Sequence, residues 1–335
     1  MKIAVIILNW NGRALMEEFL PSVIANTRAE VIVADNGSTD DSVAMLNEKF
    51  PSIRVIRFDK NYGFAEGYNK AIAQTDATYT VLLNSDVEVT PNWLDAPVAI
   101  MEADKSIAAV QPMIRSQKDK KMFEYAGAAG GFLDIYGYPY CRGRLMSVVE
   151  EDFGQYDTQT DILWATGACL FIRTDVYKKE GGLDANFFAH QEEIDMCWRL
   201  RSRGYRIVCT PKSVVYHVGA ATLKAESPQK TFLNFRNNLL MLYKNLPEKE
   251  LRRVLRVRFW LDLIAAAKFF ITVNPKNAYA VFQARSDFKR RRRNYLEIRK
   301  DNLLQTTCAT IPEIRRKSLL FSFYILRKQQ FSQLF

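Results

Sequence analysis

Continuous apolar runs alternate with amphipathic stretches over the first 220 residues of the chain. Strands are predicted at 2–8, 31–34, 53–58 and 80–83, which are mostly apolar, and each leads into a polar or glycine-containing turn. Between the first two runs, residues 14–24 carry apolar side chains at helical spacing. Buried strands of parallel sheets are continuous apolar runs, and their alternation with helices is typical of an α/β unit. The pattern therefore predicts a mostly parallel sheet flanked by helices.

The pattern is less regular beyond residue 100. Apolar runs at 108–113 and 164–172 predict further strands, and 205–209 and 214–217 predict two short ones. A helix with an acidic start is predicted over 187–203, ended by Gly204. Residues 115–160 are polar and rich in glycine and aromatic residues, which predicts long loops with short strands, a place for substrate contacts.

The last hundred residues differ from the rest of the chain in net charge and in the spacing of their apolar positions. Residues 1–230 hold 25 Lys and Arg against 30 Asp and Glu, whereas residues 231–335 hold 22 against 7. Helices are predicted over 232–243 and 248–273, and the second mixes arginine with bulky apolar residues. We expect a sheet domain at 1–225 and a helical, basic extension at 226–335.

Three roles fit this extension. An amphipathic helix rich in arginine and aromatic residues is typical of contact with an anionic membrane surface. The second possibility is that the extension packs on the sheet or forms a homodimer. Nucleic-acid binding through the arginines at 290–293 is the least favoured of the three.

Several classes of protein are disfavoured. The chain has five cysteines, an odd number, and none of them form a C-x-x-C pair. This predicts reduced thiols in a cytoplasmic chain. No uninterrupted apolar stretch reaches the roughly 18 residues of a membrane span. No G-x-G-x-x-G follows the first strand and no G-x-x-x-x-G-K-[ST] is present, which disfavours a dinucleotide-binding fold and a P-loop.

Polar side chains follow the predicted strands, namely Asn9, Asp35, Asn36, Asn84 and Asp86. The carboxyl ends of parallel strands meet at one edge of the sheet, where ligands bind in open α/β folds. Asn and Asp side chains suit the edges of a nucleobase and a ribose. We predict that Asp86 binds a divalent cation together with substrate phosphates.

Two further groups are candidates for chemistry. His217 is one of two histidines and follows a predicted strand, so it is a candidate metal ligand. Glu192, Glu193 and Asp195 begin the acidic helix, and one of them is predicted to be a general base for an acceptor hydroxyl. The alternative is structural, because acids favour a helix start and Asp195 can pair with Arg199 one turn later.

Four segments come in an order that resembles a known family. They are 5–12 (VIILNWNG), 33–40 (VADNGSTD), 61–69 (NYGFAEGYN) and 82–86 (LLNSD). They resemble the family 2 inverting glycosyltransferases of the GT-A fold, in particular the bacterial rhamnosyltransferase-like branch. Gly167, the acidic helix and 216–219 (YHVG) also match, so the resemblance covers roughly residues 2–222.

The resemblance implies roles for individual residues. Asn9 and Asp35 would line the nucleobase and ribose pocket, and Asn61 and Asn69 would shape the nucleotide side of the cleft. Asp86 would be the retained acid of the family's D-x-D metal motif, whose first position here is Asn84.

The resemblance also implies a metal contact and a base. His217 would be a further metal or diphosphate contact. The catalytic base would fall on Glu193, where the family usually has Asp, with Glu192 as the second choice. Lys230 and Arg236 are further candidates that would approach the diphosphate from the tail.

The implied reaction is inverting transfer of a sugar, with Mn²⁺ or Mg²⁺ as cofactor. The donor would be a UDP- or dTDP-sugar and the acceptor a glycan or lipid-linked glycan in bacterial cell-surface polysaccharide synthesis. Such an enzyme would work in the cytoplasm, at the inner face of the cytoplasmic membrane. The rivals are a sugar nucleotidyltransferase and a non-catalytic membrane- or nucleic-acid-binding protein with a degenerate transferase domain.

Overall fold

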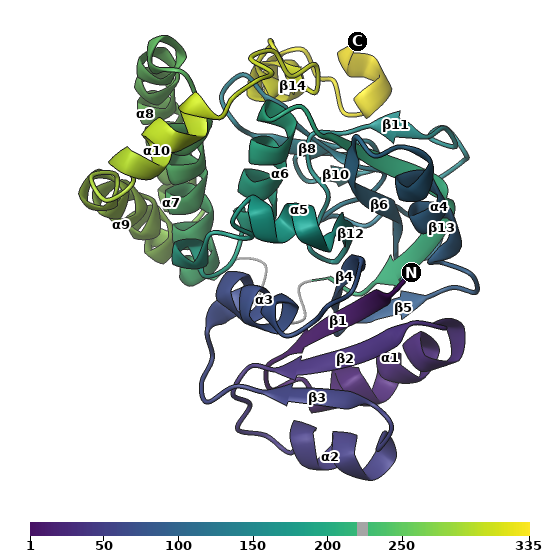
Figure 1. Ribbon diagram of the computed structural model, residues 1–335. Helices are drawn as coiled ribbons and strands as arrows, with labels where there is room; N and C mark the ends of the chain where they lie inside the picture. The colour runs from purple at the N-terminus through teal and green to yellow at the C-terminus, as the bar shows by residue number, and fades with distance from the viewer. Residues whose placement is uncertain (220–226) are drawn as a thin grey trace.

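A central mixed sheet runs through the computed structural model, which describes residues 1–219 and 227–335 (Figure 1). Within these residues the strand order is β11-β13-β6-β12-β4-β1-β2-β3, and β5 pairs with β13. The strands are β1 (Ile3–Asn9), β2 (Glu30–Asp35), β3 (Arg54–Arg57), β4 (Tyr79–Asn84), β5 (Val87–Val89), β6 (Ile107–Ser116), β11 (Thr160–Asp161), β12 (Cys169–Arg173) and β13 (Arg206–His217). Strands β4, β1, β2 and β3 are parallel, whereas β12 is antiparallel to both of its neighbours.

The apolar runs are buried on both faces of the sheet. In β1, Ala4 and Ile6 enter one hydrophobic cluster, and Val5 and Ile7 enter another on the opposite face. The first cluster is covered by α3 (Gly63–Ala73) and α6 (Glu192–Ser202), and the second by α1 (Arg13–Asn26), α2 (Ser42–Lys49) and α4 (Asp95–Ala103). The predicted α/β sheet flanked by helices is confirmed.

Residues 115–160 contribute a second, smaller sheet. Its strand order is β10-β9-β8-β7-β14, and β14, from the basic tail, lies parallel to β7. The strands are β7 (Gly131–Asp134), β8 (Pro139–Cys141), β9 (Arg144–Leu145), β10 (Val148–Val149) and β14 (Ile314–Arg315). The predicted loops with short strands are thus present, and the tail folds back to pair with them.

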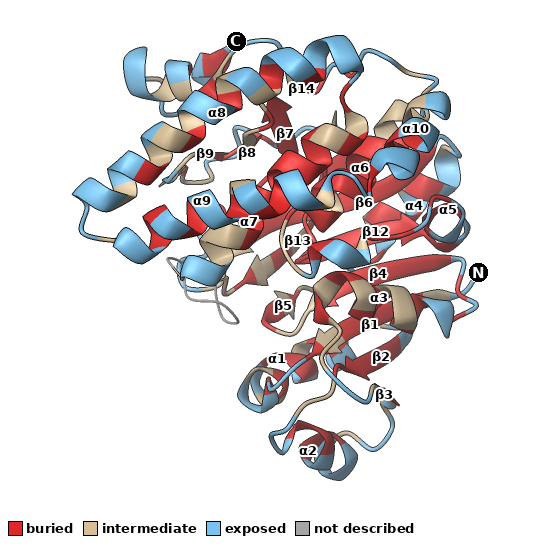
Figure 2. Cartoon of the chain, turned by 90° about the vertical axis from the view of Figure 1, so that its left-hand side faces the viewer, coloured by how far each residue is buried: buried red, intermediate tan, exposed pale blue. Residues whose placement is uncertain are grey.

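The rest of the tail is helical. It comprises α7 (Pro228–Asn245), α8 (Glu248–Ile271), α9 (Pro275–Arg291) and α10 (Leu296–Leu304), then the short helices η2 (Phe321–Ile325) and η3 (Phe331–Leu334). Helix α7 packs against α6 and α9, and its inner face is buried (Figure 2). The predicted domain boundary at 225/226 falls within 220–226, outside the described residues. None of the helices in the described ranges combines the length and apolarity needed to cross a membrane.

Two predicted elements are shorter than expected. The strand predicted over 164–172 is β12, which begins only at Cys169. The helix predicted over 187–203 begins only at Glu192, after the short helix η1 (Ala185–Phe187). Phe188, His190 and Gln191 have positive φ angles, a backbone conformation that a right-handed helix cannot contain.

Candidate active site

Asn9 and Asp35 lie side by side where β1 and β2 end. They are directly paired in the register of the two strands. The Asn9 amide Nδ2 donates to Asp35 Oδ1 at 3.1 Å, and the backbone N–H of Ser38 donates to Asp35 Oδ2 at 3.1 Å. Asn9 Oδ1 is buried and has no hydrogen-bond partner. This edge of the sheet therefore holds a buried acceptor without a partner beside a fixed carboxylate, and both groups can form hydrogen bonds.

Asn36 and Asn61 use their side chains to hold the loops together. The Asn36 Nδ2 donates to Asn61 Oδ1 at 3.1 Å and to the Gly63 carbonyl at 3.0 Å, and its Oδ1 accepts from the Tyr62 N–H at 3.0 Å. Asn61 Oδ1 also accepts from the Gly63 N–H at 2.8 Å. These two amides shape the entrance to α3.

Asn69 is also engaged with the protein. Its Nδ2 donates to the Leu183 carbonyl at 2.8 Å, and its Oδ1 accepts from the Leu183 N–H at 3.1 Å and from Tyr177 Oη at 2.6 Å. Asn69 therefore ties α3 to the turn that precedes the acidic helix.

Asp86 and His217 form a buried pair at the other end of this edge. Strand β5 lies antiparallel to β13, with Val87 opposite His217. His217 Nε2 lies 3.1 Å from Asp86 Oδ1 and 3.3 Å from Asn84 Nδ2. The other ring nitrogen, Nδ1, lies 3.4 Å from Glu124 Oε1. Burial lowers the pKa of His217, but contact with the two carboxylates outweighs it and raises the pKa to about 10.

Asp86 and His217 form an ion pair as they stand, because the raised pKa leaves a proton on His217. Their 3.1 Å separation would let both reach one small octahedral cation, whose neighbouring ligands lie about 3 Å apart, once the cation displaces that proton. Among the described residues, no three His, Cys, Asp or Glu side chains form a group that could hold a metal ion by themselves. Further ligands would then come from substrate phosphates and water.

Glu192 and Glu193 begin α6, with Glu192 buried and Glu193 half-buried, and neither carboxyl group is in an ion pair within the described residues. Oε2 of each is buried without a hydrogen-bond partner. Burial raises the pKa of Glu193 to about 7, and burial together with the neighbouring Glu193 raises the pKa of Glu192 well above its ordinary value. A carboxyl group with a pKa of about 7, as in Glu193, can accept a proton near neutral pH.

Asp195 has a different environment on the same helix. Its Oδ2 lies 2.7 Å from Lys244 Nζ and 3.2 Å from Arg199 Nε, and its Oδ1 accepts from Asn245 Nδ2 at 2.9 Å. Burial alone would raise the pKa of Asp195, but the two cations and the hydrogen bonds lower it. Asp195 therefore anchors α6 to α7, which agrees with the structural alternative.

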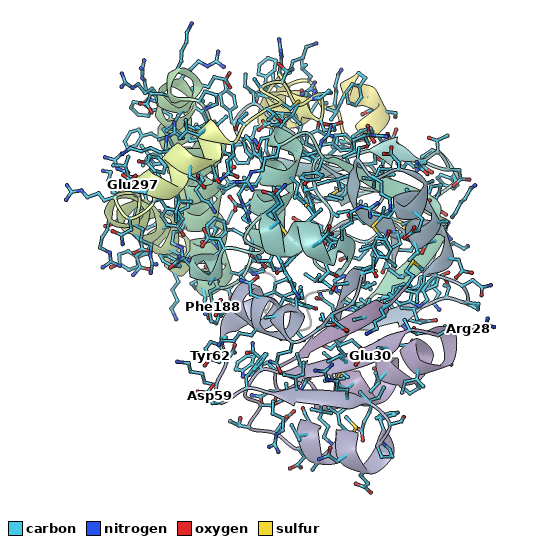
Figure 3. The ribbon with its side chains drawn as sticks, in the orientation of Figure 1. Arg28, Glu30, Asp59, Tyr62, Phe188 and Glu297 are labelled. Carbon is cyan, nitrogen blue, oxygen red and sulfur yellow. The ribbon has the colours of Figure 1, made fainter. Side chains whose placement is uncertain are left out.

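The segment that leads into Glu192 has an unusual backbone. Phe188 has φ 67° and ψ −59°, and the N–H of Ala189 donates to the Phe187 carbonyl at 2.8 Å. This is a γ-turn with positive φ, a rare and strained form. The Phe188 carbonyl accepts from the Phe64 N–H at 2.7 Å, which places the turn at the start of α3, where Figure 3 shows Phe188 on the same side as Tyr62. A Cβ on Gly63 would lie 2.5 Å from the Phe188 ring, so a larger residue would displace the turn.

Helix α7 holds the same segment from the other side. The amide Nδ2 of Asn237, which is fully buried, donates to the carbonyls of Phe187, Ala189 and His190 at 3.0, 2.9 and 2.8 Å. Arg236 Nη2 donates to the Phe187 carbonyl at 3.0 Å, and Arg236 Nε donates to Asn237 Oδ1 at 2.8 Å. The guanidinium of Arg236 is thus occupied in holding this loop, and the contacts lend no support to its predicted approach to a diphosphate.

Lys230, in the first turn of α7, interacts electrostatically with residues at both ends of the site. Burial lowers the pKa of its ammonium group, and the charge of Glu124 opposes that effect. The same ammonium contributes to the lowered pKa of His190, which burial takes to about 4. The charge of Lys230 thus interacts with Glu124 and with His190.

Residues 4–180, more than half of the chain, match the model of one protein family, described as Glycosyl transferase family 2. The chain belongs to that family. The predicted resemblance is therefore confirmed, and of the three predicted functions the glycosyltransferase is the one supported.

Curated relatives of this glycosyltransferase include two bacterial proteins. The O-antigen biosynthesis protein RfbC of Myxococcus xanthus is 26% identical over 237 residues, which are 68% of this chain and 18% of RfbC. The N-acetylglucosaminyl-diphospho-decaprenol L-rhamnosyltransferase of Mycobacterium tuberculosis is 26% identical over 220 residues, which are 60% of this chain and 71% of the relative. The chain thus spans less than a fifth of the first relative, and the second agrees with a rhamnosyltransferase-like branch.

Solved structures share the fold. TarS 1–349 of S. aureus, in complex with UDP-GlcNAc, has a TM-score of 0.55 and 15% identity, covering 91% of this chain and 93% of TarS 1–349. The mannosyltransferase PcManGT of Pyrobaculum calidifontis, in complex with GDP-Man and Mn²⁺, has a TM-score of 0.52 and 15% identity. The match covers 91% of this chain and 84% of PcManGT. The expected GT-A architecture of this glycosyltransferase is confirmed.

Two residues of the site were not anticipated. Glu124 lies in the stretch expected to be loops, and nothing in its local sequence indicates the contact with His217. Asn237 sits in the helical tail, and an Asn within a helix gives no sign that it binds three carbonyls 47 to 50 residues earlier in the chain. Both contacts depend on which elements pack together.

Proposed function

We propose that this glycosyltransferase moves a sugar from a nucleoside diphosphate to an acceptor hydroxyl by single displacement, with inversion at the anomeric carbon. One observation carries the proposal: Glu193, with a buried oxygen and a pKa raised to about 7, belongs to no ion pair in the described residues. A carboxylate in that state serves as a general base near neutral pH.

The proton and electron movements follow from this assignment. Glu193 takes the proton of the acceptor hydroxyl. At the same time the hydroxyl oxygen of the acceptor forms a bond to the anomeric carbon. The bond from that carbon to the diphosphate oxygen breaks on the opposite face, and its electron pair leaves with the diphosphate. Because attack is direct and no protein nucleophile takes part, the anomeric configuration inverts.

The other residues of the site bind and orient the donor. Asn9 and Asp35 would contact the base and ribose, and Asn36, Asn61 and Asn69 hold the loops that form this pocket. Asp86 and His217 would hold Mn²⁺ or Mg²⁺, with Asn84 beside them. The cation, when bound, stabilises negative charge on the leaving diphosphate.

The substrates are inferred from chemistry and from the relatives. The relatives are described as acting in O-antigen biosynthesis and on a diphospho-decaprenol acceptor, so we favour a glycan or lipid-linked glycan acceptor in cell-surface polysaccharide synthesis. A UDP- or dTDP-sugar is the favoured donor. A lipid-linked acceptor would place the enzyme at the inner face of the cytoplasmic membrane.

A donor panel tests the proposal. Thermal unfolding is followed with dTDP-rhamnose, UDP-glucose, UDP-galactose, UDP-N-acetylglucosamine and GDP-mannose, with Mn²⁺ and with a chelator. We expect one donor to raise the melting temperature only with Mn²⁺, and the product formed from that donor to show the opposite anomeric configuration by NMR. Retention of configuration would contradict the direct displacement, and a donor shift that persists in chelator would contradict the metal site.

A further inference from the structure

Helices α8 and α9 form a hairpin whose closed end is apolar and exposed. Figure 2 shows pale blue along the outer side of both helices and at the turn that joins them. Ile271 is 77% exposed and Val273 is 87% exposed. The large exposed apolar residues of this end include Trp260, Ile264, Phe270, Ile271, Val273 and Phe282. Exposed apolar side chains gathered in this way mark an interaction surface.

The exposed residues of α8 lie on one side of the helix. Trp260, Ile264 and Ile271 are spaced by four and seven residues, which places them on the same face. Val254 and Ala266 on the other face are buried in the protein. The helix therefore presents an apolar stripe away from the body of the molecule.

The far ends of both helices are basic. Arg252, Arg253 and Arg256 lie near the start of α8, and Lys289 and Arg290 lie near the end of α9. Residues 251–295 contain 12 Lys and Arg but only two acids, Asp262 and Asp287. Both acids are buried.

The two acids add no exposed negative charge because they are paired with arginines. Asp262 pairs with Arg258 and Arg285, and Asp287 pairs with Arg290 and Arg291. The exposed charge of residues 251–295 is therefore entirely positive. Glu248 and Glu250 in the first turn of α8 are exposed acids, and Glu248 pairs with Arg252, but residues 248–295 still hold 13 Lys and Arg against four acids.

A second apolar segment continues the surface. Lys268 Nζ lies over the Tyr324 ring at 5.6 Å, which brings η2 beside the second half of α8. Phe321, Ile325 and Leu326 around it are exposed, and Arg327 and Lys328 follow directly. The surface thus repeats the same arrangement of apolar residues next to basic ones.

We propose that the closed end of the α8–α9 hairpin inserts into the headgroup region of an anionic phospholipid bilayer, while its basic ends contact the lipid phosphates. The proposal deepens the proposed function, since it rests on an acceptor that is held at a membrane. A surface that is apolar at its tip and positive behind it complements such a bilayer. A symmetric dimer through the same surface would instead bring two positive surfaces together.

Vesicle binding of the full chain tests this surface. The chain is mixed with vesicles of phosphatidylglycerol and phosphatidylcholine, or of phosphatidylcholine alone, and bound protein is measured by flotation. We expect binding to the anionic vesicles, with affinity about tenfold or more weaker in the variant Ile264→Ser/Phe270→Ser/Ile271→Ser. The variant Arg252→Gln/Arg253→Gln/Arg256→Gln should lose the preference for anionic lipid, and high salt should have the same effect.

The control for the vesicle assay replaces an exposed aromatic residue outside the hairpin. Phe153 is 78% exposed and lies outside the hairpin, so Phe153→Ser should bind vesicles as the unchanged chain does. Equal binding by the apolar triple variant would overturn the proposal. So would a dimer in sedimentation that the triple variant abolishes, because a second copy would then cover the surface.

Donor binding separates this proposal from the proposed function. The apolar triple variant should keep the Mn²⁺-dependent thermal shift with the donor, since none of its three positions belongs to the site. Vesicle binding without a donor shift in the unchanged chain would remove the proposed function and leave the docking surface standing. A donor shift without vesicle binding would remove the docking surface and leave the proposed function standing.

Discussion

The side-chain amide of Asn237 donates a 2.8 Å hydrogen bond to the carbonyl of His190, two residues before Glu192. This bond joins the helical tail to the loop that presents the candidate base. His190 and Gln191 both have positive φ, so the loop depends on contacts from outside its own sequence. Helix α7 therefore supports the loop of the candidate active site.

Replacing Asn237 by Ala should lower kcat about tenfold to a hundredfold with little change in KM for the donor. The loop would relax and move the carboxylate away from the acceptor hydroxyl, and small displacements of reacting groups are costly. Steady-state kinetics would measure the effect. Gln229→Ala, at an exposed position on the same helix, should leave kcat unchanged, and an equal loss in both variants would contradict the positioning role.

Replacing Glu193 by Gln should lower kcat by a factor of about 10² to 10⁴, because the amide cannot accept the acceptor's proton. Donor binding, measured by thermal shift, should remain. Glu192→Gln is the matched comparison, and we expect a smaller loss. If Glu192→Gln is the more damaging change, the base is Glu192.

Activity should rise with pH through about 7 and then level off. Burial raises the pKa of Glu193 to about 7, so the group is protonated and inactive below that pH and ionised above it. The pH dependence of kcat in the unchanged chain would show one ascending limb. The residual activity of Glu193→Gln should lack that ascending limb. If the limb persists in this variant, another group is responsible for it.

Replacing Glu124 by Gln should weaken Mn²⁺ binding about tenfold to a hundredfold. Glu124 faces the ring nitrogen of His217 that points away from Asp86, and partners of this kind orient a metal-binding histidine. Free Mn²⁺ can be measured by electron paramagnetic resonance without any substrate. Glu88→Gln is a suitable control, since Glu88 lies near Asp86 in sequence but pairs with Lys120, and it should leave Mn²⁺ binding unchanged.

Replacing Asp195 by Ala should lower the free energy of unfolding by about 3–5 kcal/mol at pH 7, because Lys244 and Arg199 would lose a buried partner. The pKa of Asp195 is lowered in the folded chain, so its contribution is present above the ordinary value of 3.8 and is lost as pH falls through the folded value. Urea unfolding would measure both effects. A stability difference that stays constant into strongly acidic solution would contradict the assignment.

The local pattern of apolar residues was sufficient to predict the strands in the parallel half of the sheet. In β1, four consecutive apolar residues enter two cores on opposite faces, and only a strand covered on both sides requires such a run. The same logic placed Asn9, Asp35 and Asp86 at one edge, because side chains that follow parallel strands gather there. The start of the acidic helix could not be predicted in this way, since positive φ at Phe188 and His190 contradicts their intrinsic preference.

The sequence by itself determined the layered α/β fold, the family and the edge of the sheet that carries the polar residues, because these follow from periodicity and from residues close together in the chain. Only the tertiary structure decided that Glu193 keeps a buried oxygen without a partner while Asp195 is paired, although both lie on one turn of α6. It also brought Glu124 to His217 and Asn237 to His190. Burial and long-range hydrogen bonds set the charge and position of a side chain, and neither is encoded in the residues next to it.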